Sequence, residues 1–174
     1  VVSGNNVSLT DLNAIDLGPS TVGGALSVSA AGAGITSITQ SGALSVGTTT
    51  SLTPGAGNSV LLDNAANDFT GAVGVANGLN LTLRDANALV LGAVSITGAL
   101  SLTAGGAVTQ TGALTVGTTT SLTAGANDIT LSNAGNDFTA AVTVVSGNNV
   151  SLTDLNAIDL GASSVSGALS VSAA

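Results

Sequence analysis

The sequence predicts an all-β fold, a parallel β-solenoid with about three strands in each coil. Three observations support this prediction: the chain repeats itself, its apolar and polar residues alternate, and it contains almost no aromatic residues. The segment VVSGNNVSLTDLNAIDLG at residues 1–18 returns without change at residues 144–161. Repetition at a fixed period is the sequence signature of a repeat architecture.

A shorter repeat, of about 70 residues, lies inside this long period. Three alignments show it: residues 80–92 match 6–18, residues 111–123 match 41–53, and residues 132–142 match 63–73. Two such units make the long period, which leads from Val1 to its copy Val144. We therefore expect residues 1–174 to be one solenoid segment of a longer repeat protein, with units at approximately 1–74, 75–143 and a partial 144–174.

Alternation of apolar and polar residues runs through every unit, as in Val7-Ser8-Leu9-Thr10. A period of two is typical of strands, because successive side chains point to opposite faces. Helix is not expected, because the chain has 24 Gly residues and neither Glu nor Lys. The expected strands of the first unit are 7–11, 14–18, 20–23, 25–30, 34–39, 42–47, 48–53, 58–63 and 68–75. Nine strands in one unit predict three coils of roughly 23 residues each.

The composition favours a narrow interior. The chain is 44% hydrophobic, yet Phe69 and Phe138 are its only aromatic residues. Val, Leu, Ile and Ala must therefore fill the core, and aliphatic side chains of similar size suit a uniform bore. An array of antiparallel β-sandwiches, with one domain for each repeat unit, is the alternative, although such domains usually carry larger core residues.

The phrases GALSLTAGGAVTQTGALTVGTTTSLTAGANDITL at 98–131 and NDFTGAV at 67–73 resemble the repeats of large secreted bacterial surface proteins. These are the filamentous-haemagglutinin-like adhesins and related autotransporter β-strand repeats. The resemblance covers essentially the whole chain. It implies a right-handed parallel β-helix, export to the bacterial cell surface, and a role as a stalk, fibre or adhesin.

Charge limits the partners that we expect. The formal net charge is −8, and Arg84 is the only basic residue. Nucleic acids and anionic membranes are poor partners for such a chain, because binding to them needs several cations. We expect the chain to associate with itself, end to end or laterally, and to contact host or neighbouring cells. A weak, multivalent surface-, glycan- or ice-binding module is the alternative function.

Acid–base catalysis could use only the nine Asp residues and one Arg. A polysaccharide hydrolase with paired carboxylates is the least favoured function. Its obvious pair is Asp11 and Asp16, repeated as Asp154 and Asp159. The middle unit has Val90 in place of the second carboxylate, so the pair is not maintained. We therefore predict no enzyme, no catalytic residues and no cofactor.

Metal binding has one candidate segment, the turn that contains Asp63, Asn64, Asn67 and Asp68. Oxygen ligands of this kind suit Ca²⁺. The second unit replaces one carboxylate with Ser132, and the nonapeptide pattern of calcium-loaded solenoids is missing. The preferred interpretation is an Asn/Asp turn whose amides stack between coils, without a metal site.

Two further motifs have structural interpretations. TTTSLT at 48–53 and 118–123 places Thr at alternate positions, which ice-binding faces also do, but it occurs only once per unit. We interpret these Thr side chains as facing solvent on a strand. Asn6, Asn80 and Asn149 begin Asn-X-Ser/Thr patterns, which alone do not indicate glycosylation in a bacterium.

Overall fold

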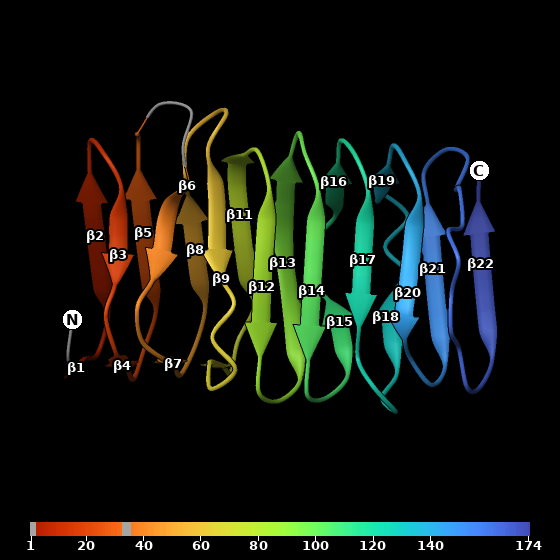
Figure 1. Cartoon of the computed structure of the whole chain (residues 1–174), viewed down its shortest axis with the longest axis horizontal. Helices are drawn as coiled ribbons and strands as arrows, with labels where there is room; N and C mark the ends of the chain where they lie inside the picture. The colour runs from red at the N-terminus through yellow and green to blue at the C-terminus, as the bar shows by residue number, and fades with distance from the viewer. Residues whose placement is uncertain (1–2, 33–35) are drawn as a thin grey trace.

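The computed structural model describes residues 3–32 and 36–174. Every regular element in this part of the chain is a β-strand, and every pairing between strands is parallel. The strands descend at the front and ascend at the back as the chain advances from the N-terminus to the C-terminus (Figure 1). This is a right-handed parallel β-solenoid. The predicted fold is confirmed, and the antiparallel sandwich array is excluded.

The strands form three sheets. The first sheet is short and contains β1 (Ser3–Gly4), β4 (Ser20–Val22), β7 (Leu44–Val46) and β10 (Asp68–Phe69). The second follows the order β2 (Val7–Asp11), β5 (Leu26–Ala30), β8 (Thr50–Thr53), β11 (Val73–Gly78), β13 (Leu89–Ile96), β15 (Val108–Gln110), β18 (Ile129–Leu131), β21 (Val150–Asp154) and β22 (Leu169–Ala173), with β16 (Leu114–Val116) and β19 (Asp137–Phe138) beside this path. The third contains β3 (Ile15–Leu17), β6 (Thr36–Gln40), β9 (Ser59–Leu62), β12 (Leu81–Asp85), β14 (Leu100–Ala104), β17 (Thr120–Thr123) and β20 (Val142–Ser146).

The coil is shorter than the sequence predicted. Seven successive pairings in the second sheet lead from Val7 to its repeat Val150, so one coil takes about 20 residues. Single steps vary in length, since the step from Val73 to Leu91 is shorter than the step from Leu26 to Thr50. The corners absorb this variation, and the strands keep their parallel register.

One repeat unit therefore spans about three and a half coils, half of the seven that make the long period. Equivalent strands show the consequence directly. Val7 lies in the second sheet, its counterpart Leu81 lies in the third, and the next counterpart Val150 lies in the second again. Equivalent residues of two adjacent units therefore lie on opposite faces of the solenoid. Only the long period returns a residue to the same face.

The interior is a continuous column of aliphatic side chains with one Phe in each complete unit. In β5, Leu26, Val28 and Ala30 are buried, whereas Ser27 between them is exposed. Phe69 and Phe138 are both fully buried. Burying one such large apolar side chain contributes roughly 1.5–3 kcal/mol. Because the buried cluster runs from Leu17 to Leu152, neighbouring coils stabilise one another along the whole rod.

One predicted strand is divided in the structure, and others are shorter at their ends, such as 42–47, which is reduced to β7. The expected strand 68–75 is two strands, β10 and β11, which belong to different sheets. A corner separates them at Gly71, where a Cβ atom would lie only 2.5 Å from the carbonyl oxygen of Thr48. The expected strand 48–53 begins only at Thr50. The start of the expected strand 34–39 lies outside the described residues, and its remainder belongs to β6.

Candidate functional site

Asn67 lies at a corner between β9 and β10 and makes hydrogen bonds to several other segments. Its amide is fully buried. Its Oδ1 accepts hydrogen bonds from Gln40 Nε2 (2.8 Å) and from the backbone N–H of Leu44 (3.0 Å). Its Nδ2 donates to Gln40 Oε1 (2.8 Å) and to the carbonyl oxygens of Leu62 and Arg84. One side chain therefore satisfies backbone groups of three successive coils.

The same arrangement returns in the second unit around Asn136, which is also fully buried. It exchanges hydrogen bonds of 2.8 and 2.9 Å with the amide of Gln110 and accepts one from the N–H of Leu114 (3.0 Å). It also donates to the carbonyl oxygens of Leu131 and Thr153. An amide contact between coils is thus present at both corners, but it joins the Asn of the turn to a Gln of the neighbouring coil and is not a ladder of turn amides. These residues hold the corners together, because buried polar groups are costly unless paired.

A buried carboxylate completes each corner. Asp85 accepts hydrogen bonds from the N–H groups of Phe69 (2.9 Å) and Asn87 (2.8 Å). Its burial raises its pKa above the ordinary value; these two hydrogen bonds lower the pKa, and the nearby charge of Asp68 raises it further. Asp154 is buried in the same way and accepts from the N–H of Phe138 (2.9 Å).

These contacts bear on the hypothetical hydrolase pairs. Asp154 binds backbone N–H groups on both of its oxygens, since Oδ1 accepts from Asn156 (2.8 Å). Asp159 is exposed and lies beyond that turn. In the first unit, Asp11 accepts from the N–H of Asn13 (2.7 Å), whereas Asp16 accepts from the hydroxyl of Thr39 at 3.4 Å. Asp11 and Asp154 thus each cap a local turn, by accepting a hydrogen bond from the backbone N–H two residues further on.

In the candidate calcium turn, some of the side chains that carry oxygen atoms are buried in the solenoid and others face solvent. Asn67 points into the corner, whereas Asp63 is exposed and Asn64 Oδ1 accepts from the N–H of Ala66 (2.9 Å) in a local turn. Asp68 is half-buried on the neighbouring strand. The four side chains therefore do not share one centre. Across residues 3–32 and 36–174, no group of three or more His, Cys, Asp or Glu side chains is placed to hold a metal ion.

The three Asn residues of the glycosylation-like patterns cap the next coil. Asn6, Asn80 and Asn149 each accept a hydrogen bond through Oδ1 from the N–H of an Ala residue 19 positions later, at 2.8–3.0 Å. The Gly before each Ala makes room for this contact, because a Cβ at Gly98 would collide with Oδ1 of Asn80. The recurring Asn and Gly-Ala-Leu phrases are therefore two halves of one contact between coils.

The prediction that the alternate Thr side chains of the TTTSLT motif face solvent was wrong for one Thr in each copy of the motif. Thr48 and Thr118 are exposed, but Thr50 and Thr120 are buried in the bore, and neither buried hydroxyl has a hydrogen-bond partner. The alternation of side chains along a strand could have revealed the burial of Thr50, since Thr50 and Leu52 lie two residues apart and must share a face. Thr48 and Thr50 therefore do not form a row of side chains on the outer surface.

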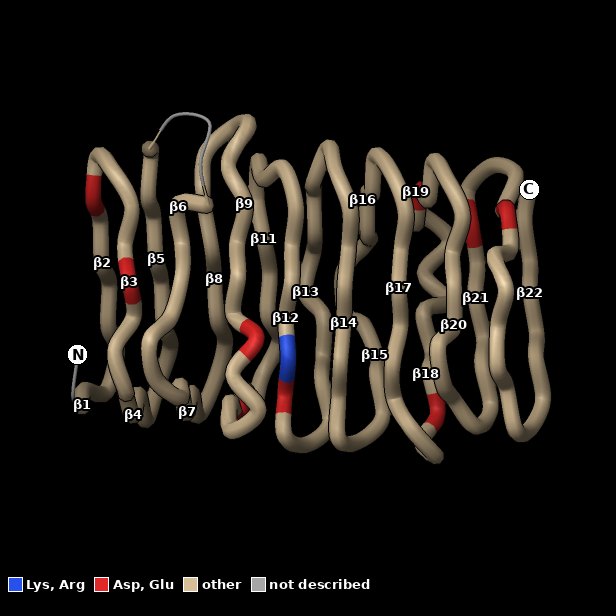
Figure 2. Tube along the Cα trace, viewed as in Figure 1, with Lys and Arg blue, Asp and Glu red and all other residues tan. Residues whose placement is uncertain are grey.

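Charged residues do not gather into one patch. The single cationic segment lies on β12 directly beside an anionic one, and the other anionic segments are spread along the rod (Figure 2). Arg84 is exposed on β12. No described helix has the length and hydropathy needed to cross a membrane.

Small hydroxyl side chains form rows on the outer surface of the broad sheets. In the second sheet, Ser8, Ser27 and Ser51 are neighbours in register. In the third sheet, the corresponding row is Thr82, Ser101, Ser121 and Thr143. The inward neighbours of these residues are apolar except for Thr50 beside Ser51 and Thr120 beside Ser121, so the rows follow from the alternation of side chains along each strand.

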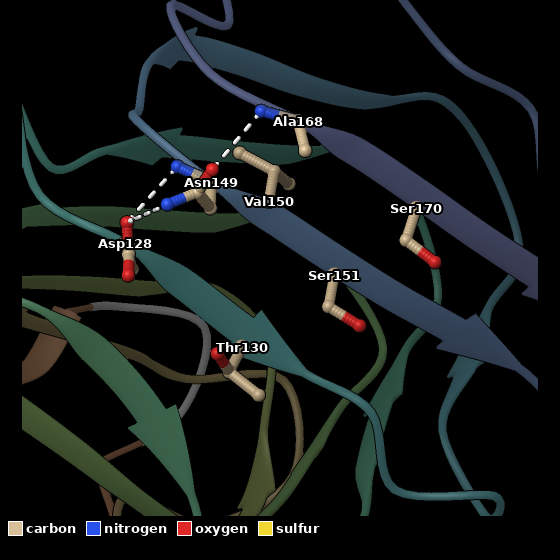
Figure 3. A pocket seen from close by; sticks show the side chains of 7 residues that line it. All are labelled: Asp128, Thr130, Asn149, Val150, Ser151, Ala168 and Ser170. Carbon is tan, nitrogen blue, oxygen red and sulfur yellow. Dashed lines mark hydrogen bonds between the residues drawn. The ribbon is translucent and has the colours of Figure 1, made fainter.

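A shallow hollow of about 160 Å³ lies over β18, β21 and β22 (Figure 3). Asp128 stands at one side and accepts hydrogen bonds of 3.0 Å from the backbone N–H and the amide of Asn149 and from the amide of Asn148. These bonds, led by that from the backbone N–H, lower its pKa, and desolvation opposes them only in part. The hollow is lined by Asp128, Thr130, Asn149, Val150, Ser151, Ala168 and Ser170. Such a surface can offer hydrogen bonds to a hydroxylated ligand.

Comparison with known families gives one match. The family described as Repeats of unknown function (DUF5649) matches three successive segments, residues 4–76, 78–145 and 147–174. The chain belongs to this family. No curated protein and no solved structure matches it. In this chain, a complete DUF5649 repeat is a section of β-solenoid about three and a half coils long, with one Asn-centred corner and one buried Phe.

Proposed function

We propose that these DUF5649 repeats form a rigid structural segment of an extracellular bacterial fibre or adhesin stalk. The observation that carries this proposal is the unbroken series of parallel pairings from β2 to β22, which runs along the rod with the aliphatic column inside it. Each coil is bound to the next by backbone hydrogen bonds and apolar contact. Such nearest-neighbour coupling gives a stiff spacer whose length grows with the number of repeats.

The extracellular setting is supported by the resemblance of 67–73 and 98–131 to the repeats of filamentous-haemagglutinin-like and autotransporter proteins. The solenoid fold and the repetitive family agree with that resemblance, and the finer assignment is part of the proposal. A surface stalk holds a recognition domain away from the cell, so the repeats themselves need stiffness more than chemistry.

Length against repeat number tests the spacer role. We would compare the chain with versions that contain one and two further copies of its long period, segment 1–143, using small-angle X-ray scattering and electron microscopy. Each added period should lengthen the particle by about 34 Å at constant width, because seven coils stack at about 4.8 Å each. A particle that widens or bends into a compact shape would contradict the proposal. Protease treatment of intact producing cells, followed by immunodetection, tests the location separately.

A second candidate is a weak, multivalent binder of surfaces or glycans, favoured by the hydroxyl rows and the hollow at Asp128. Ice is a poorer target, since equivalent rows of successive units lie on opposite faces. Pull-down on immobilised polysaccharides with Asp128→Ala and Thr130→Val variants tests this candidate. Retention that these variants reduce would favour binding, whereas passage of the native chain without retention would reject it.

A further inference from the structure

The bend between β11 and β12 contains an Asn residue with an unusual combination of features. Asn77 is exposed, and it is the one Asn of the chain that is followed by Gly. Its φ angle is 57°, whereas the other positive φ angles among the described residues belong to Gly. Asn tolerates this left-handed conformation better than most residues, although few residues with a side chain adopt it.

Packing fixes the residue after Asn77 as Gly. Gly78 is buried, and a Cβ at this position would lie 3.1 Å from Cγ2 of Ile96 and 3.3 Å from Cγ of Pro54. The equivalent Gly147 of the next unit is enclosed in the same way by neighbouring side chains. The interior of the solenoid therefore requires a residue without a side chain directly after the exposed position.

The equivalent position of the next unit carries no amide. Ser146 occupies the place of Asn77, and its hydroxyl accepts a hydrogen bond from the N–H of Gly125 (3.0 Å). Within the part of the chain that the structure describes, the side-chain amide of Asn77 takes part in no hydrogen bond. The amides of Asn67 and Asn80, in contrast, are held between coils. No contact of this kind keeps the amide of Asn77 away from the main chain.

We propose that Asn77 is a site of spontaneous deamidation, with water as the co-reactant. The backbone nitrogen of Gly78 attacks Cγ of Asn77, the bond between Cγ and Nδ2 breaks, and ammonia leaves with the proton of the attacking nitrogen. Water then opens the cyclic succinimide, at Cγ to give Asp or at the main-chain carbonyl carbon to give isoaspartate. A following Gly favours the attack, because no side chain shields its nitrogen and both reacting groups belong to one chain.

The folded state controls the rate through the pairing of β11 with β13. Gly78 is paired with Ile96, so its nitrogen must leave this ladder before it can attack. A register shift separates this pair from the pair of Val75 with Val94. Opening therefore has to disrupt only the irregular end of the ladder and not a whole coil. Deamidation should be slower in the folded chain than in the unfolded chain, but it should still proceed.

Either product changes the solenoid at this bend. Both replace a neutral amide with a carboxylate, which adds to a net charge that is already −8. Isoaspartate also lengthens the main chain by a methylene group, directly before a Gly that packs against Ile96. Aged material should therefore lose stability at this coil, and the cause would be chemical change rather than unfolding.

Timed incubation of the native chain in mildly alkaline buffer, followed by peptide mass spectrometry, tests the proposal. We expect a progressive gain of the mass that replacement of NH₂ by OH produces, located at Asn77. The rate should rise with pH, because a backbone nitrogen that has lost its proton is the better nucleophile. Peptides that contain isoaspartate should also become substrates for a protein isoaspartyl methyltransferase. Asn13 and Asn87 are internal controls, since both are exposed but are followed by Ala, and they should remain unchanged while Asn77 reacts.

Asn77→Ser is the matched variant, since Ser146 occupies the equivalent position in the next unit. It should keep the circular dichroism spectrum of the native chain and lose the mass gain. Incubation in concentrated guanidinium chloride gives the rate for the unfolded chain. A folded chain in which Asn77 stays intact while the unfolded chain reacts to completion would overturn the proposal. Equal reaction at Asn13 or Asn87 would also overturn it, because the Gly and the bend would then have no influence.

Discussion

The side-chain amides of Gln40 and Asn67 face each other across adjacent coils and exchange two hydrogen bonds of 2.8 Å. This reciprocal pair returns between Gln110 and Asn136. It fixes a corner at which backbone groups of three coils would otherwise be buried without partners. The repeat unit is thus defined by its polar corners as much as by its apolar column.

We expect Asn67→Ala to destabilise the solenoid by roughly 2–4 kcal/mol, because it leaves several buried polar groups without partners. Urea unfolding followed by circular dichroism measures the change. Asn64→Ala is the matched control in the same turn; its side chain makes a local bond to Ala66 and should cost less than about 1 kcal/mol. Equal losses from the two variants would contradict this role for Asn67.

Thr50→Val and Thr120→Val should each stabilise the fold, by about 1 kcal/mol. Both hydroxyls are buried without a hydrogen-bond partner, and valine removes that desolvation cost while keeping the shape of the side chain. Thr53→Val, on the same strand as Thr50 but half-buried on the outer face, should be nearly neutral. A lower urea midpoint for Thr50→Val would show that its hydroxyl is satisfied in solution.

Gly98→Ala should cost roughly 1–3 kcal/mol. The new methyl group would collide with Oδ1 of Asn80 and lie 2.7 Å from the carbonyl oxygen of Leu79, so the capping bond to Ala99 would be lost. Gly18→Ala is the control, since no atom lies within 4 Å of the position of its Cβ. Thermal unfolding of both variants distinguishes this local collision from a general effect of glycine.

The pH dependence of stability should carry opposite contributions from Asp85 and Asp128. Burial raises the pKa of Asp85, so its favourable contribution is complete below the unfolded value of 3.8 and is lost as pH rises through the folded value. Hydrogen bonds lower the pKa of Asp128, so its contribution is present above 3.8 and is lost as pH falls through the folded value. Unfolding free energies of Asp85→Asn and Asp128→Asn, compared with the native chain across this range, should therefore change in opposite directions. Parallel changes would refute the assignment.

The sequence was sufficient to predict the parallel solenoid, because alternation and repetition directly report strand period and stacking. It did not reveal the coil length, since corners of different size separate Leu26 from Thr50 and Val73 from Leu91. A unit of about 70 residues can be divided into three coils or into three and a half, so the length of the unit does not by itself give the number of residues in each coil. The inward position of Asn67 was also missed, although it lies two residues before buried Phe69 and shares its parity. Residue type indicated an Asn/Asp turn, but it did not show that the amide of Asn67 points inward to a Gln of the neighbouring coil.

The distance between spin labels at Ser27→Cys and Ser170→Cys tests the central claim most directly. The chain has no native cysteine, and these positions are equivalent residues on the same sheet, seven coils apart. A continuous parallel solenoid predicts a narrow distribution centred near a separation of about 34 Å, at about 4.8 Å per coil. A broad distribution, or one centred far beyond that distance, would mean that the repeats fold as separate modules and would contradict the account.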